Sequence, residues 1–170
     1  MDRAYVSLAA SSVVRICCDS FENGDWSGRL YTWYKEKPVS FRNAGELLEY
    51  MEGFYDWLGY PQASVKARSF RRVPERTDVS ERSSIQENRM KQKEEKAVVT
   101  KEETMNKHQG EKATFVVRIQ YRQNASWQGQ VTWAEKNKTV PFRSALELLK
   151  LIDSTEGVPE ENWDRGDGQE

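Results

Sequence analysis

The feature that most constrains the fold is a repeat within the chain. Residues 13–52 and residues 116–153 can be aligned through a shared Val-Val-Arg-Ile string, with two extra residues in the first copy before its Trp. The matched residues of the first copy are Val13, Val14, Arg15, Ile16, Trp26, Gly28, Val39, Phe41, Arg42, Ala44, Glu46, Leu47 and Leu48. Their counterparts are Val116, Val117, Arg118, Ile119, Trp127, Gly129, Val140, Phe142, Arg143, Ala145, Glu147, Leu148 and Leu149. A repeat of roughly 40 residues predicts one supersecondary unit, built twice.

Within each copy, the spacing of apolar residues changes from strand-like to helix-like. In the second copy, apolar residues alternate with polar ones from Phe115 to Tyr121 and again from Trp127 to Trp133, which predicts two half-buried strands. A short third strand follows through Val140 and Phe142. Each copy is therefore predicted to form three strands followed by a helix, which we call a βββα unit.

The two predicted helices begin with the same signal. Asn43 with Glu46, and Ser144 with Glu147, have the spacing of a capping box. The first helix carries an apolar stripe from Ala44 to Leu58 and stops before Gly59.

Trp33 departs from the repeat because it lies one position late relative to Trp133. Neighbouring side chains of a strand point to opposite faces, so this slip would put Trp33 outside the core. We predict a β-bulge in the first copy that corrects the slip.

A βββα unit is too small to be stable alone. The two copies could pack on each other, or each could pair with its counterpart in a second chain, and tethering favours the first arrangement. The sequence predicts an α+β fold in which two three-stranded antiparallel sheets, each with one helix, pack pseudo-symmetrically. On this interpretation residues 114–154 form the second unit, and residues 1–72 hold the diverged first one.

The sequence between and after the copies has a different composition. Residues 73–113 contain no aromatic residue and similar numbers of acidic and basic ones, so we predict a disordered linker. Residues 155–170 contain six acidic residues and one Arg and are predicted to be a disordered tail, in which Trp163 is the one aromatic residue.

Composition argues against catalysis and against a metal centre. The single His, His108, falls in the predicted linker, and the two cysteines, Cys17 and Cys18, are adjacent, so they supply neither a catalytic base nor a tetrahedral metal site. Gly-rich phosphate-binding loops are absent from the sequence. We therefore expect a protein without enzymatic activity, metal or cofactor. Reduced neighbouring cysteines and a poor secretion signal favour the cytoplasm.

Two groups of residues are candidates for binding. If Val117, Ile119 and Tyr121 face the helix, polar side chains share the opposite sheet face and suit an anionic or hydrogen-bond-rich partner. This first group consists of Arg118, Gln120, Arg122, Gln128 and Gln130, with Thr132 beside them. A second group, placed around Phe70, consists of Lys66, Arg68, Arg71 and Arg72 and could contact phosphates.

A third set of residues is predicted to be structural, because its members are large apolar side chains or glycines at matched strand positions. It consists of Trp26, Gly28, Phe41, Trp127, Gly129, Trp133 and Phe142.

Two resemblances to known families follow from these residues. Residues 115–153 resemble a family of short uncharacterised Clostridia-type bacterial proteins without a known activity, and residues 13–52 look like a diverged copy. The string from Asn124 to Gly129 is similar to the second half of the PilZ signature, which implies binding of a cyclic dinucleotide. It departs from PilZ domains because Arg118 and Arg122 lie in the same strand, directly before that string.

These observations predict a bacterial, non-catalytic binding or scaffolding module that contacts a protein or an anionic ligand, without a membrane. Self-association through the repeat unit stays open. The alternative is a nucleotide- or nucleic-acid-binding protein that uses the arginines of the sheet and the basic segment 66–72.

Overall fold

The centre of the fold is one antiparallel sheet of six strands in the order β3-β2-β1-β4-β5-β6. The computed structural model describes residues 12–63, 70, 98–123 and 126–157. The strands are β1 (Val14–Glu22), β2 (Asp25–Tyr31), β3 (Val39–Phe41), β4 (Ala113–Tyr121), β5 (Gln128–Trp133) and β6 (Lys138–Phe142). The helices are α2 (Ala44–Leu58), α4 (Glu102–Lys107) and α5 (Ala145–Asp153), with a short 3₁₀ turn at Ala134–Lys136. The predicted α+β class is confirmed, but a single sheet replaces the two three-stranded sheets that we expected.

The two halves of the chain join where β1 pairs with β4. Val14 lies opposite Val117, and Ile16 lies opposite Phe115. Each of these strands would otherwise present a row of unpaired backbone groups at the edge of a small sheet. Pairing them makes both strands central, so the shorter strands β3 and β6 form the edges.

The strand registers correct the alignment of the two halves. Cys18 pairs with Gly28 as Ile119 pairs with Gly129, and the two glycines pair with Phe41 and Phe142 in the same way. Each of these second-half residues lies the same number of positions after its first-half counterpart, so the alignment of the two halves needs no insertion. Aligning the Val-Val-Arg-Ile strings is therefore wrong by two residues, and the counterpart of Val14 is Phe115.

A β-bulge interrupts the first strand of each half at the same place. The register shifts between Cys18 and Ser20 in β1, and between Ile119 and Tyr121 in β4. A bulge that both halves share cannot compensate for a slip in one of them. The first strand does contain a bulge, but our prediction that it brings Trp33 to the face occupied by Trp133 is wrong. Trp33 packs on the other face of the sheet.

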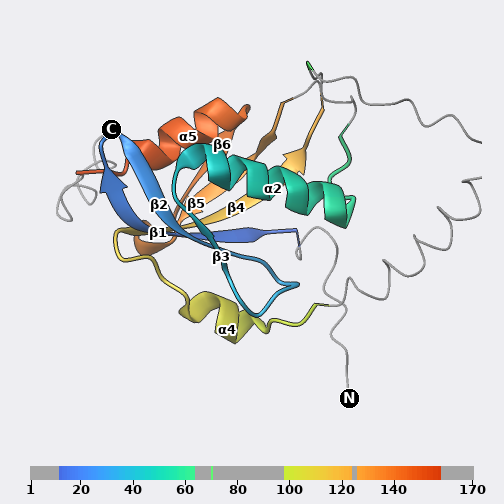
Figure 1. The fold of residues 1–170 in the computed structure, drawn as a ribbon, viewed down its shortest axis with the longest axis horizontal. Coiled ribbons are helices and arrows are strands. Elements are labelled where there is room, and N and C mark those ends of the chain that lie inside the picture. Colours follow the sequence, from blue (N-terminus) through green and yellow to red (C-terminus); the bar gives the residue numbers. More distant parts are fainter. Residues whose placement is uncertain (1–11, 64–69, 71–97, 124–125, 158–170) are drawn as a thin grey trace, which may run out of the picture.

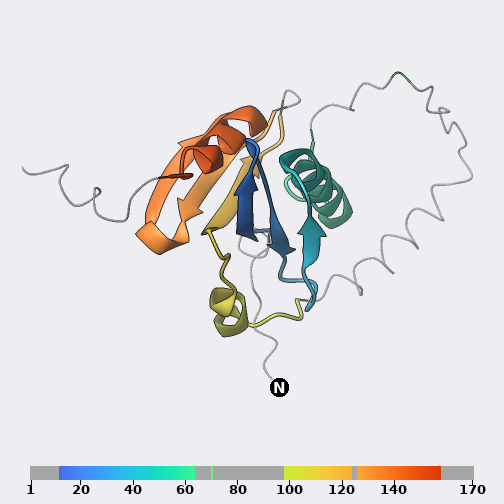
Figure 2. The same cartoon turned by 60° about the vertical axis from the view of Figure 1, so that its left-hand side comes forward.

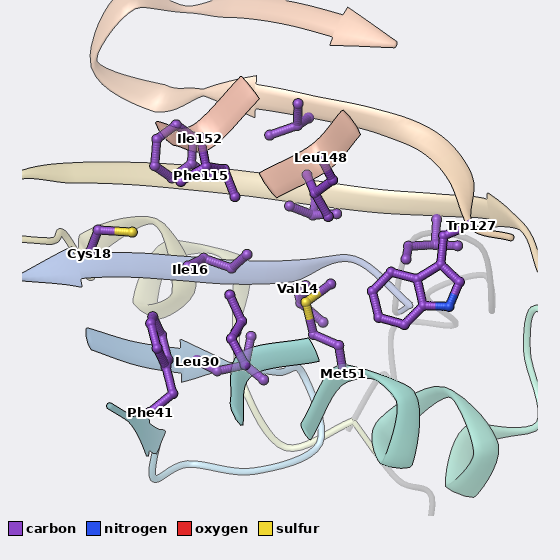
Figure 3. Close-up of a cluster of buried hydrophobic side chains, with 14 of the residues drawn as sticks. Val14, Ile16, Cys18, Leu30, Phe41, Met51, Phe115, Trp127, Leu148 and Ile152 are labelled. Carbon is purple, nitrogen blue, oxygen red and sulfur yellow. The ribbon is translucent and has the colours of Figure 1, made fainter. Parts of the chain in front are cut away.

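Helices α2 and α5 lie on one face of the sheet, and α4 lies on the other (Figures 1 and 2). Asn43 and Ser144 accept hydrogen bonds from the backbone N–H of Glu46 and Glu147, at 2.8 and 3.0 Å. The main core lies between the sheet and the two long helices, and Figure 3 shows that both halves contribute to it. Its largest fully buried side chains include Phe41, Tyr55, Phe115, Phe142, Leu47, Met51, Leu148 and Ile152.

Helix α4 was not expected, because residues 98–113 fall within the predicted disordered linker. They instead cross the outer face of the first half, where Met105 joins Cys17, Tyr31 and Trp33 in a second, smaller apolar cluster. Residues 73–97 of that linker, and residues 158–170 of the predicted tail, lie outside the described part of the chain.

Candidate binding surface

Arg122 is the candidate whose position differs most from the prediction. Its side chain is only 4% exposed, and it faces α2 rather than sharing a sheet face with Arg118. Nε donates to the carbonyl oxygen of Pro61 at 2.8 Å. The two terminal nitrogens donate to Glu52 at 3.1 Å and to Asp56 at 2.8 Å. Arg122 is therefore a structural residue that ties the end of β4 to α2, and it is not available to a ligand.

The bulge in β4 explains this difference. Simple alternation would place Arg118, Gln120 and Arg122 on one face, as the sequence predicted. The extra residue at the bulge reverses the alternation beyond it. Tyr121 is therefore 54% exposed, whereas Arg122 turns toward the helix side.

The other members of the first candidate group do lie together on the face of the second half that points away from α2 and α5. We call this surface the Arg118 face. It consists of Val116, Arg118, Gln120, Gln128, Gln130 and Thr132. Arg118 lies directly opposite Gln130 across the β4–β5 pair, and both side chains are exposed. Within the described residues, no acceptor binds the Arg118 guanidinium.

A pocket of mixed character, which we call the polar pocket after its arginine, amide and hydroxyl groups, lies at one end of the Arg118 face. It has a volume of about 260 Å³ and is lined by Ser12, Tyr60, Arg118, Ile119, Gln120 and Tyr121. Four of these residues come from the bulged end of β4, and Ser12 and Tyr60 come from the chain before β1 and after α2. A guanidinium, an amide and hydroxyl groups are suitable partners for a carboxylate or a phosphate.

The corresponding face of the first half is covered by its own chain. Arg15 donates to the backbone carbonyls of His108, at 2.6 Å, and Asn106, at 3.4 Å. The His108 ring stacks on Tyr31 with the ring centroids 3.9 Å apart. Residues 98–112 thus fill the first outer face, which makes Arg15 unavailable to a partner.

The bulge residue of the first half, Asp19, holds this covering segment in place. Its carboxylate forms a bidentate ion pair with the Arg29 guanidinium, at 2.9 and 3.0 Å, and accepts a hydrogen bond from the backbone N–H of Glu111 at 3.1 Å. Arg29 also donates to the carbonyl of Gln109 at 2.8 Å. This arrangement could not be predicted from residue patterns, because the side chains of Arg15, Asp19 and Arg29 bind the segment through its backbone groups.

The residues predicted to be structural lie in or beside the core. Trp26, Phe41, Trp127 and Phe142 are each less than 9% exposed, and Trp133 is partly buried against Phe115. The backbone around the bulges leaves no space for a side chain at the two glycines. A Cβ atom at Gly28 would lie 1.9 Å from the carbonyl oxygen of Cys17, and one at Gly129 would lie 2.0 Å from that of Arg118.

The second candidate group cannot be placed on the molecule. Lys66, Arg68, Arg71 and Arg72 lie outside the described residues, and Phe70 alone among its neighbours is described, as a fully exposed side chain.

The cysteines do not form a reactive site. Cys17 and Cys18 are free and buried, on opposite faces of β1. Burial raises the pKa of Cys17 to about 11 and raises the pKa of Cys18 further, so both stay protonated near neutral pH. In the parts of the chain that the structure describes, His, Cys, Asp and Glu side chains form no cluster suited to a metal ion.

Comparisons of the chain with family models, with curated proteins and with solved structures found no match. Of the helices that the structure describes, none combines the length and apolar character needed to cross a membrane.

Proposed function

We propose that this chain is a non-catalytic binding or scaffolding module, and that the Arg118 face holds a protein segment rich in carboxylates and hydrogen-bonding groups. The supporting observation is the difference between the two outer faces of the sheet. Residues 98–112 cover the first face through two arginines and an apolar cluster. On the second face, no described segment lies over Arg118, Gln128 and Gln130.

The proposal includes a division of labour between two copies of a duplicated βββα unit. Equivalent strand registers, equivalent bulges and equivalent capping boxes support duplication. In this interpretation the segment 98–112 covers the outer face of the first copy, so that the first copy mainly completes the sheet. The second copy retains the accessible face.

A non-catalytic role is consistent with the chemistry near Arg118. The polar pocket contains an arginine, an amide and hydroxyl groups, and none of its described lining residues carries a carboxylate, an imidazole or a thiol. General acid–base catalysis most often uses a group of one of these kinds, although tyrosine can also serve and Tyr60 and Tyr121 line the pocket.

The direct test is capture of partners from native lysate by the immobilised full chain and by an Arg118→Glu variant. Arg118 is exposed and makes no described ion pair, so reversing its charge should leave the fold intact and abolish capture of acidic partners. Lys150→Glu is the matched control, because Lys150 is an exposed cation on α5. Equal capture by the unaltered chain and the Arg118→Glu variant would show that the Arg118 face does not bind these partners.

A second candidate function is nucleotide binding in the polar pocket, where Tyr121 places an exposed ring beside Arg118. The burial of Arg122 weakens this candidate, because one of the two expected arginines is already paired with Glu52 and Asp56. Titration with a cyclic dinucleotide and with short RNA at two salt concentrations tests it. A saturable signal that weakens with salt supports nucleotide binding, and the lack of such a signal rejects it.

A further inference from the structure

A second cavity lies on the opposite side of the sheet, beneath the end of α5. It has a volume of about 180 Å³, and most of its lining is apolar. The lining residues are Phe115, Val131, Trp133, Lys138, Val140, Leu151, Ser154 and Thr155. An apolar cavity of roughly 150 Å³ engineered into another protein binds benzene, so this α5 cleft has room for an aromatic ring.

The cleft exists because the two long helices differ in length. Helix α2 has 15 residues, whereas α5 has nine and ends at Asp153. The extra turns of α2 carry Phe54 and Trp57, which pack on Tyr34 with ring centroids 6.0 and 5.4 Å apart. In the second half, the described chain continues from α5 only through short hydrogen-bonded turns to Gly157, and it leaves the cleft beside the end of α5.

The chain that follows α5 starts at the rim of this cleft. Ser154 and Thr155 are part of the lining, and the described chain ends two residues later, at Gly157. Residues 158–170 lie outside the structure, and Trp163 is their one aromatic residue. An extended chain covers about 3.3 Å per residue, so Trp163 can reach every part of the cleft.

The charges of the cleft and of this segment are complementary. Lys138 is one of the lining residues, and the Lys136 ammonium lies 6.0 Å from the centre of the Trp133 ring. In the sequence, acidic residues lie on both sides of Trp163, namely Glu160, Glu161 and Asp164. An indole flanked by carboxylates therefore matches an apolar cleft that has lysines at its edge.

We propose that residues 158–170 dock on their own chain, with the Trp163 indole in the α5 cleft and the neighbouring carboxylates beside Lys136 and Lys138. The docked segment takes the place that the last turns of α2 occupy in the first half. This interaction is separate from the Arg118 face, which lies on the other side of the sheet.

The test is ¹⁹F NMR of the full chain labelled with 5-fluorotryptophan. The chain has six tryptophans, and Trp163→Phe identifies the resonance of Trp163. Docking predicts a Trp163 resonance that is displaced from the free-chain position and has lost most of its solvent isotope shift. Leu151→Glu should return this resonance to the free-chain position, whereas Leu146→Glu, at an exposed position of the same helix, should not.

A second pair of variants tests the same contact in case Leu151→Glu unfolds the protein. Lys138→Glu should increase the solvent isotope shift of Trp163, and Lys150→Glu should not, while the resonances of the buried Trp26 and Trp127 stay unchanged in both. A free-chain resonance with a full isotope shift in the unaltered protein overturns the proposal. A Trp163 shift that depends on protein concentration also overturns it, because the occupant is then the tail of a second copy.

Discussion

Arg122 illustrates how one buried cation links segments that are distant in sequence. Its three nitrogens reach a carbonyl in the loop after α2 and two carboxylates on α2, and its guanidinium carbon lies 5.8 Å from the centre of the Tyr55 ring. Glu52 also accepts a hydrogen bond from the Trp127 indole at 2.8 Å. The end of β4 and the start of β5 are thus fastened to the helix of the other half.

We predict that Arg122→Ala lowers the free energy of unfolding by about 2–4 kcal/mol, because hydrogen bonds to charged groups are lost and a buried carbonyl loses its donor. Arg118→Ala is the control in the same strand and should change stability by less than about 0.5 kcal/mol. Urea denaturation of both variants measures the difference. Equal stabilities would mean that the Arg122 contacts contribute nothing to the fold.

Gly129 gives a second prediction at this scale. Gly129→Ala should lower the free energy of unfolding by about 1–3 kcal/mol or more, since the new methyl group would overlap the backbone of β4. Gly53→Ala in α2 should raise stability by about 0.5–1 kcal/mol, because nothing lies within 4 Å of the added atom. Thermal melts of the two variants should therefore shift in opposite directions, and a shift in the same direction would contradict the geometry of the bulge.

At the scale of the elements, the local sequence patterns were sufficient to predict the two long helices and most strands. The capping boxes and the stripe of α2 are visible in the sequence, and Gly59 ends that helix with a positive φ of 69°. Helix α4 could not be predicted, because it has six residues and buries only Met105. It is held largely by backbone carbonyls that accept from Arg15 and Arg29, and side-chain patterns do not reveal such contacts.

The bulges were equally hard to locate. The sequence slip at Trp33 suggested a bulge, but the bulges lie at Asp19 and Gln120, where no residue type marks them. The assignment of Arg122 to the Arg118 face failed for this reason.

The segment that contains α4 should respond to pH through His108. Partial burial, and then the charges of Arg29 and Arg15, lower the pKa of His108 below its usual value of 6.5. The folded state therefore binds the proton more weakly than the unfolded state does. The stabilisation is fully present above pH 6.5 and is lost as the pH falls through the lowered pKa.

Amide hydrogen exchange of residues 98–112, measured between pH 7.5 and pH 5 and corrected for intrinsic exchange, tests this prediction. Protection should decrease on the acidic side in the unaltered chain, and His108→Gln should remove most of the decrease. Asp19 and Tyr31 also face this segment, so a pH dependence that persists unchanged in His108→Gln would assign the effect to another group.

At the scale of the whole molecule, the two halves share one sheet and one core. Strands β1 and β4 are central only because they pair with each other, and the core contains buried side chains from both halves. Tyr55 of α2 also packs edge-on against Trp127, with ring centroids 6.1 Å apart. An isolated half would expose a central strand and part of this core, and a chain of about 45 residues has little other apolar surface to bury.

The most direct test of this account is thermal and urea unfolding of residues 113–157 expressed without the first half. We expect a fragment that either lacks a cooperative transition or folds only as a dimer through the exposed edge of β4. A sharp, cooperative transition from a sample shown to be monomeric by sedimentation would contradict the shared core, and with it the division of labour between a covered first half and an open second half.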